Sequence, residues 1–417
     1  MQSLFTWPLP FFIFFVFFSV EAAAAEETVT RLTLREAVDL SRQRDFEIIN
    51  AQSGVESTRA DRITAGLLPN PQLSVNDTFI NPSAPRVGSQ ITARIDQPFE
   101  TFGKRRHRID SAEQATRSSE YHLSDIVRQR TLEVKNAFYH ILLAQEHLRL
   151  ARDNAERFRD ILRINTLRFN KGDISEAELM KVRLQELDFQ NDVILATVEL
   201  QGAERDLKSL LVIDPSKPVE IVGELKYQPL EIDLDSLKEK ALETRPDLRE
   251  RGSEVKRAES DIRLARSMRF PDVSVGVEYD TVGPDYHGLI GAGMSLPLPI
   301  FNRNQGEIRK AEVSLKNANT LLAAKKQQIG LEIEYAYREF LQNRAHVAAF
   351  ESGQLQDAKS SREIVETAYK KGGSSVLDLL EAERTFNMTL LNYYQALFNY
   401  QQSLFQLESI SGKEMIQ

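Results

Sequence analysis

The segment Pro71-Gln72-Leu73-Ser74-Val75 returns 200 positions later as Pro271-Asp272-Val273-Ser274-Val275. The same offset pairs further positions of the two halves, namely Val55 with Val255, Asp61 with Asp261, Ala65 with Ala265, and Phe169-Asn170-Lys171-Gly172 with Tyr369-Lys370-Lys371-Gly372. Chance identities do not keep one register along a whole chain. The sequence therefore predicts an internally duplicated protomer, built from two copies of one supersecondary unit.

Each repeated segment opens a stretch in which apolar and polar residues alternate. Leu73 and Val75 alternate with Ser74 and Asn76, and the second half continues the pattern in Val273, Val275, Val277 and Tyr279. A period of two predicts strands with one apolar and one polar face. Pro and Gly cluster at 81–88 and 281–288, so we expect two β-hairpins.

Long helices are predicted after each hairpin. No Pro occurs between Pro98 and Pro215, and none follows Pro299. Apolar residues recur with alternating spacings of three and four at Val193, Ala196, Leu200, Ala203 and Leu207. This spacing is typical of packed antiparallel helices or a coiled coil. One helix over residues 110–169 would be about 90 Å long at about 1.5 Å per residue, much longer than a compact domain.

These patterns divide the chain into successive segments. They are a signal peptide (1–25), the leading helix of the first repeat (26–70), the first β-hairpin (71–99), the first long helical hairpin with its turn near 170–175 (100–210), a linker (211–232), the leading helix of the second repeat (233–270), the second β-hairpin (271–299) and the second long helical hairpin with its turn near 370–375 (300–417). We expect each leading segment to hold a helical stretch, over 34–68 and 237–268. The signal peptide is predicted from the apolar run 11–18, which is followed by the alanines 22–25.

Composition argues against several classes of protein. The formal net charge of −8 argues against a nucleic-acid partner, because phosphates call for clustered Lys and Arg. The chain has no Cys, which excludes disulfides, thiolate metal sites and a thiol nucleophile. We find no phosphate-binding loop, dinucleotide fingerprint or zinc-protease motif. We therefore expect neither an enzyme nor a resident cofactor or metal.

The two hairpins supply four strands, too few to close a barrel within one chain. An open sheet in lipid would leave backbone hydrogen-bonding groups unpaired along its edges. Three copies would supply twelve strands, and an even-stranded barrel with an apolar outside and a polar lumen is the outer-membrane arrangement. The expected fold class is therefore a mixed α + β membrane protein, a trimer with a twelve-stranded β-barrel and long antiparallel coiled-coil-like helices.

Two phrases and the internal repeat carry a family resemblance; the phrases are Leu32-Thr33-Leu34-Arg35-Glu36-Ala37 and Leu68-Pro69-Asn70-Pro71-Gln72-Leu73-Ser74-Val75. Through them the sequence resembles the TolC family of outer-membrane efflux ducts over essentially the whole mature chain. The strand-to-helix junctions 97–105 and 297–306 look more like the heavy-metal-cation branch of that family, the CzcC and CusC type.

The resemblance implies a passive outer-membrane exit channel of a tripartite efflux system. It implies a homotrimer in outer-membrane lipid, a helical barrel in the periplasm, and docking to a periplasmic adaptor and an inner-membrane proton-driven pump of the RND type. The branch implies heavy-metal cations as cargo, of the cobalt, zinc and cadmium or the copper and silver class.

Two glycine-containing turns connect the long helices. The resemblance makes these turns the periplasmic tips that meet the adaptor, through Lys171, Gly172, Ser175, Lys371, Gly372 and Ser375. Gly permits the left-handed backbone that such a turn needs. Ser175 with Glu178 is the pattern of a capping box, and Ser375 with Asp378 resembles one. As local structure, these residues are simply helix caps, and the docking role is a separate hypothesis.

Asp378 and Glu381 follow the second turn, three residues apart, and so share one helix face. Threefold symmetry would gather six carboxylates around one axis, a ring that attracts cations. The resemblance places Asp378 and Glu381 at the acidic constriction of a periplasmic gate, with Tyr369 as a latch and Glu178 as the acidic residue of the first turn. The alternative is a solvated helix face.

Other functions stay open at this stage. The duct could serve drugs, organic solutes or type I secretion instead of metals. A periplasmic coiled-coil adaptor or scaffold is a further alternative, although it would carry a lipoyl-like or barrel-shaped β domain between its helices, and we see no pattern of that kind.

Overall fold

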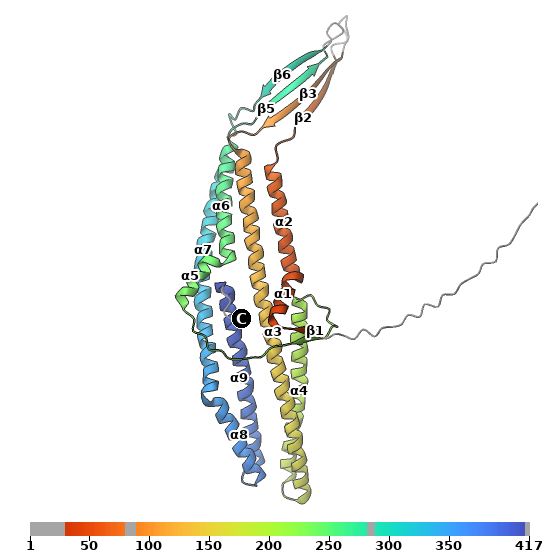
Figure 1. Ribbon diagram of the computed structural model, residues 1–417, viewed down its shortest axis with the longest axis vertical. Coiled ribbons are helices and arrows are strands. Elements are labelled where there is room, and N and C mark those ends of the chain that lie inside the picture. The colour runs from red at the N-terminus through yellow and green to blue at the C-terminus, as the bar shows by residue number, and fades with distance from the viewer. Residues whose placement is uncertain (1–29, 80–88, 282–287, 413–417) are drawn as a thin grey trace, which may run out of the picture.

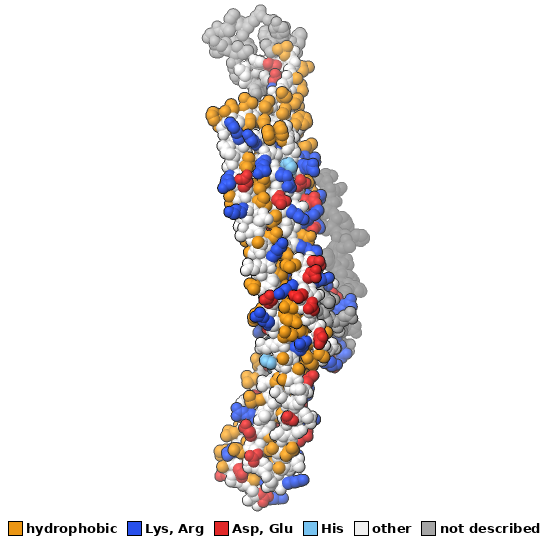
Figure 2. All heavy atoms as spheres, turned by 90° about the vertical axis from the view of Figure 1, so that its left-hand side faces the viewer, with side chains coloured by type: hydrophobic (Ala, Val, Ile, Leu, Met, Phe, Trp, Pro, Cys, Tyr) orange, Lys and Arg blue, Asp and Glu red, His pale blue; other side chains and the backbone are white. Residues whose placement is uncertain are grey.

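The computed structural model describes residues 30–79, 89–281 and 288–412, which form a long rod of helices with a small sheet at one end (Figure 1). Figure 2 shows the same rod from the side, with all heavy atoms. The elements follow in the order β1 (Thr30–Leu32), α1 (Leu34–Arg44), α2 (Phe46–Gly66), β2 (Gln72–Phe79), β3 (Ser89–Phe99), α3 (Lys104–Lys171), α4 (Glu176–Leu210), β4 (Val219–Ile221), α5 (Leu234–Thr244), α6 (Pro246–Ser267), β5 (Val273–Asp280), β6 (Leu289–Ser295), α7 (Gln305–Ala349), the π-helix η1 (Phe350–Gln354), α8 (Leu355–Lys370) and α9 (Val376–Ser411). The signal peptide predicted over 1–25 lies outside the described residues.

Each leading segment, for which the sequence predicts a helical stretch, contains two helices. Asp45 separates α1 from α2, and its side chain accepts hydrogen bonds from the backbone N–H groups of Glu47 and Ile48. Arg245 separates α5 from α6 because Pro246 follows it, and a residue before proline avoids the helical conformation. Both breaks therefore have local causes in the sequence, a capping Asp and a proline.

The helix α3 runs without interruption from the sheet to the far end of the rod (Figure 1). Its 68 residues reach about 100 Å at about 1.5 Å per residue. The corresponding path in the second half is divided into α7, η1 and α8. Gly353 within η1 has φ 152°, which residues with a side chain rarely adopt. This interruption was not predicted, because a lone Gly is tolerated in many helices.

The sheet is antiparallel, in the order β2-β3-β5-β6. Its register places apolar residues in rows across the strands, as Leu73, Ile95, Val277 and Ala292 show. The apolar side chains of these rows are largely exposed. The opposite face is polar: Arg94 bonds Asp96 and Glu278, and Asp280 accepts from Gln90 and Thr92. The predicted alternation of faces is thus confirmed for the described strands.

A short parallel sheet ties the linker to the start of the described chain. In it β4 pairs with β1, Thr30 opposite Val219 and Leu32 opposite Ile221. The linker then crosses α9, where the hydroxyl of Tyr400 donates to the carbonyl of Gln228 at 2.6 Å. Three-residue strands show no readable period, so the sequence did not predict this sheet.

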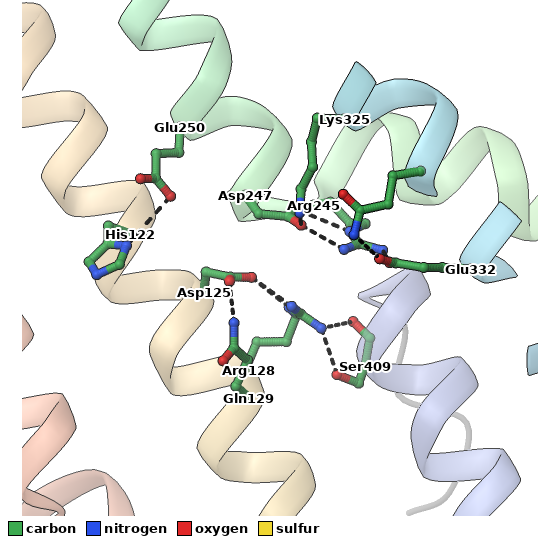
Figure 3. Close-up of polar contacts among 11 residues, drawn as sticks. His122, Asp125, Arg128, Gln129, Arg245, Asp247, Glu250, Lys325, Glu332 and Ser409 are labelled. Atoms are coloured by element: carbon green, nitrogen blue, oxygen red, sulfur yellow. Dashed lines mark hydrogen bonds and ion pairs between the residues drawn. The ribbon is translucent and has the colours of Figure 1, made fainter. Parts of the chain in front are cut away.

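A buried ionic network joins helices at the middle of the rod (Figure 3). Arg245 is 3% exposed, and its guanidinium donates to Asp247 and Glu332, each at 2.6 Å. Lys325 of α7 lies 2.8 Å from the same Asp247. Burial opposes the charge of Asp247, but hydrogen bonds from Arg245 and Lys325 dominate and lower its pKa. The network fixes the start of α6 against α7.

Candidate functional site

The two tip turns have matching hydrogen bonds. The N–H of Gly172 donates to the carbonyl of Phe169 at 2.9 Å, and that of Gly372 to Tyr369 at 3.1 Å. Both glycines have left-handed backbones, with φ 81° and φ 78°. Lys171 is the last residue of α3, Lys371 is the C-cap of α8, and both are exposed. The turns lie together at the end of the rod away from the sheet (Figure 1).

Both predicted capping boxes are present. The Oγ of Ser175 accepts from the backbone N–H of Glu178, whose carboxylate accepts from the N–H of Ser175. Ser375 and Asp378 make the same pair of bonds at the start of α9. Hydrogen bonds from the side chain and backbone of Ser375, then from Ser374, lower the pKa of Asp378. Asp378 therefore keeps its negative charge at neutral pH.

The three carboxylates predicted for the gate lie on two helices, α4 and α9. Asp378 and Glu381 are both exposed, on the first turns of α9. Glu178 is half-buried and caps α4. Within one chain, Asp378 and Glu178 therefore belong to separate turns, and each is hydrogen-bonded within its own capping box. Only symmetry between chains could bring the copies of Asp378 and Glu381 together in a ring.

Tyr369 joins the two helical hairpins. Its ring is buried, and its hydroxyl donates to the side-chain oxygen of Asn165 on α3. The guanidinium of Arg168 lies 5.2 Å from the ring centroid. Around this link, apolar side chains of both hairpins form one cluster, which includes Phe158, Ile161, Val182, Phe189, Val376 and Leu379. Asn165 was missed in the sequence, although it continues the buried positions Phe158 and Ile161 at helical spacing.

Replacing Tyr369 with Phe is expected to destabilise the tip by about 1–3 kcal/mol, because the Asn165 oxygen would be left buried without its donor. The measurement is the thermal unfolding midpoint of detergent-solubilised protein. Tyr335→Phe, at a Tyr that is 72% exposed, is the matched control and should leave the midpoint unchanged. Equal midpoints for the wild type and Tyr369→Phe would show that the link contributes nothing.

No metal-binding cluster is found among the residues described: nowhere do three or more His, Asp or Glu side chains come together in a way that could hold an ion. Within 30–412, apart from the two undescribed loops, no helix has the length and apolar character that crossing a bilayer requires.

Comparison with known sequences supplies the family. A profile described as "Outer membrane efflux protein" matches residues 18–211 and 237–413, most of the chain. The chain belongs to the outer membrane efflux protein family. Members are channels rather than enzymes, so the protein is an efflux channel of the outer membrane that extends into the periplasm.

Relatives within the family differ in their cargo. The chain is 27% identical to the cobalt-zinc-cadmium resistance protein CzcC of Cupriavidus metallidurans over 375 residues, 89% of this chain and 88% of CzcC. It is 23% identical to the pyoverdine export outer membrane protein OpmQ of Pseudomonas aeruginosa, over 74% of this chain and 66% of OpmQ.

Solved structures share the fold. A CusC crystal structure superposes with a TM-score of 0.77 at 18% identity, covering 91% of each chain. The open-state MtrE outer membrane channel of Neisseria gonorrhoeae gives 0.72 at 20% identity, covering 91% of this chain and 88% of MtrE. At such identities the likeness concerns the fold alone, and it confirms the resemblance to TolC-type channels.

Proposed function

We propose that this channel is the passive outer-membrane exit of a tripartite efflux system and acts as a homotrimer. The observation that carries the proposal is the sheet, which combines a largely exposed apolar face with a polar, hydrogen-bonded face. Its outer strands, β2 and β6, each have only one partner in the described chain. Pairing β6 of one copy with β2 of the next would close twelve strands in outer-membrane lipid, leaving no edge exposed.

Duplication of the protomer belongs to the same proposal. In support of it, two helices, two strands and two long helical arms follow in the same order in each half, and Gln72 and Val273 begin corresponding strands. The arms would continue the bore through the periplasm as a helical barrel. The segment bounds expected from the sequence, from 1–25 to 300–417, remain our proposed division of the chain.

We assign the tips to partner binding. Lys171, Gly172, Ser175, Lys371, Gly372 and Ser375 would meet a periplasmic adaptor, which connects the channel to an inner-membrane RND pump. These residues lie at the end of the rod that is farthest from the sheet, and all six are exposed. A nucleic-acid partner is not part of the proposal, because the chain is acidic overall.

We assign heavy-metal cations as the cargo. The support is the similarity to CzcC, which covers nearly nine-tenths of both chains, whereas the match to OpmQ is shorter and weaker. Export of organic solutes is the second candidate, since OpmQ and the toluene efflux protein TtgC are also relatives. The channel itself would not bind its cargo tightly, because a tightly bound ion would leave slowly.

Conductance of the purified protein in planar bilayers tests the gate and the channel together. In a trimer, Asp378 and Glu381 would place six carboxylates near one axis. We expect Asp378→Asn with Glu381→Gln to reduce the preference for cations over anions severalfold, because the ring loses its charge. Asn preserves much of the shape of the Asp378 cap. Glu363→Gln, at an exposed acid of α8, is the control.

The outcomes separate the two proposals. An unchanged ion preference in the double variant, with normal conductance, would refute the gate assignment alone. A water-soluble monomer without conductance would refute the channel itself. Heat-dependent mobility on SDS gels reports the trimer independently of either result.

A further inference from the structure

A buried carboxyl group near the tip has no partner. Glu383 of α9 is 1% exposed, and neither of its carboxyl oxygens has a hydrogen-bond partner among the described residues. Asn387, one turn later on the same face, is buried as well, and both polar atoms of its side chain are unpaired. Buried polar groups are nearly always satisfied in folded proteins, so this pair requires an explanation.

Cations able to satisfy Glu383 lie on the neighbouring helices. Arg362 of α8 is 8% exposed, its Nε is unpaired, and its guanidinium lies 4.0 Å from the ring centroid of Phe386. Arg157 of α3 also has a buried, unpaired Nε. The charges of Arg157 and Arg362 act to lower the pKa of Glu383, yet neither oxygen of Glu383 has a hydrogen-bond partner among the described residues. A carboxylate and two guanidiniums therefore lie close together without pairing.

The arrangement is electrostatically costly. Burial raises the pKa of Glu383, the charges of Arg157 and Arg362 oppose that rise, and the charge of Glu366 adds to it. Glu366 itself is paired with Lys370. On α4, the buried Glu186 accepts a hydrogen bond from Gln190 of its own helix. A buried charge without a partner is far less stable than a paired one.

The helix that carries Arg362 lies between two breaks in the regular helical backbone. The π-helix η1 with Gly353 at φ 152° precedes α8, and the turn with Gly372 at φ 78° follows it. The backbone of Gly353 is not helical, so η1 is a kink between α7 and α8. A turn of α8 between these two points would move the guanidinium of Arg362, which now lies over the Phe386 ring, relative to the carboxyl group of Glu383.

We propose that Glu383 is a conformational switch of the tip, unpaired in the arrangement described here and paired with Arg362 or Arg157 in a second arrangement of α8. Protonation of Glu383 stabilises the first arrangement, because a neutral acid is less costly to bury. Ionisation stabilises the second. Tyr369 lies on the same helix, so its bond to Asn165 breaks when α8 turns. The switch thus couples proton uptake at one buried acid to the link between the two hairpins.

Distances between spin labels test the switch directly, and the cysteine-free chain permits labelling at chosen sites. Labels at Arg159→Cys on α3 and Lys359→Cys on α8 occupy exposed positions about three turns before the ends of their helices. Singly labelled proteins supply the distances between protomers for subtraction. In the wild type, we expect a second distance population that grows as the pH rises, about tenfold for each unit by which the pKa of Glu383 differs between the arrangements.

Substitutions of Glu383 and of the two arginines test whether these residues produce the second distance population. Glu383→Gln should show the first distance population at every pH, and Arg157→Gln with Arg362→Gln should lose the second population too. Glu363→Gln should behave as the wild type. A single, pH-independent population in the wild type, or an unchanged second population in Glu383→Gln, would overturn the switch. Normal trimers on SDS gels confirm folding of each variant. Because the distances need no cargo or partner, the switch and the proposed export function can fail separately.

Discussion

Replacing Gly172 or Gly372 with tryptophan is expected to abolish adaptor-dependent efflux while trimers still form in the outer membrane. Both glycines have left-handed backbones, and a Cβ atom added at either would meet nothing within 4 Å. The cost to folding is therefore about 1–2 kcal/mol of local backbone strain, with no clash at the added Cβ atom. Native proteins are commonly stable by about 5–15 kcal/mol, so the fold should tolerate the change.

A graded series separates strain from steric exclusion. Gly172→Ala and Gly172→Trp carry the same backbone penalty, but only the indole projects into the space that a partner would occupy. We expect growth on cobalt, zinc and cadmium salts, in a strain that has the adaptor and pump, to be nearly normal for Ala and lost for Trp. Gly103→Ala, at another left-handed position near the sheet, controls for strain. Full metal resistance of the Trp variants would show that the tips are not part of the adaptor interface.

The parts of the fold that the sequence predicted are those with a short local period. Alternation in 73–76 and 273–279 requires only neighbouring residues, and the long helices follow from apolar spacing and missing proline. The breaks at Asp45 and Arg245 also have local causes, a cap and a proline, but each lies inside a helical pattern that conceals it. The pairing of β1 with β4 joins residues 189 apart in sequence and leaves no such pattern.

In the candidate site, too, the sequence predicted the local contacts and missed the distant ones. The capping boxes Ser175–Glu178 and Ser375–Asp378 are readable because their partners are three residues apart. The bond between Tyr369 and Asn165 spans 204 residues, and the polar cluster around Glu383 draws on three helices. Such contacts depend on how α3, α8 and α9 pack, and one sequence contains no record of that packing.

Removing Asp247 is expected to be the most destabilising single substitution outside the core. In the wild type its carboxylate accepts from Arg245 and pairs with Lys325. Asp247→Ala leaves Arg245, 3% exposed, without its main partner, and breaking a buried pair in this way costs about 3–5 kcal/mol. The unfolding midpoint of the solubilised protein measures the loss. Glu56→Ala, which breaks the exposed pair with Arg59, should cost less than about 1 kcal/mol.

Acid provides an independent check on the same network. Because the pKa of Asp247 is lowered in the folded state, its contribution is complete above the ordinary value of 3.8 and is lost as the pH falls below it. The difference in stability between the wild type and Asp247→Asn should therefore shrink as the pH is lowered below that value.

Replacing the whole set with Arg245→Met, Asp247→Leu and Lys325→Met should restore most of the stability that Asp247→Ala loses, since no buried charge then lacks a partner. If Asp247→Ala is as stable as the Glu56→Ala control at neutral pH, the network does not hold α6 against α7.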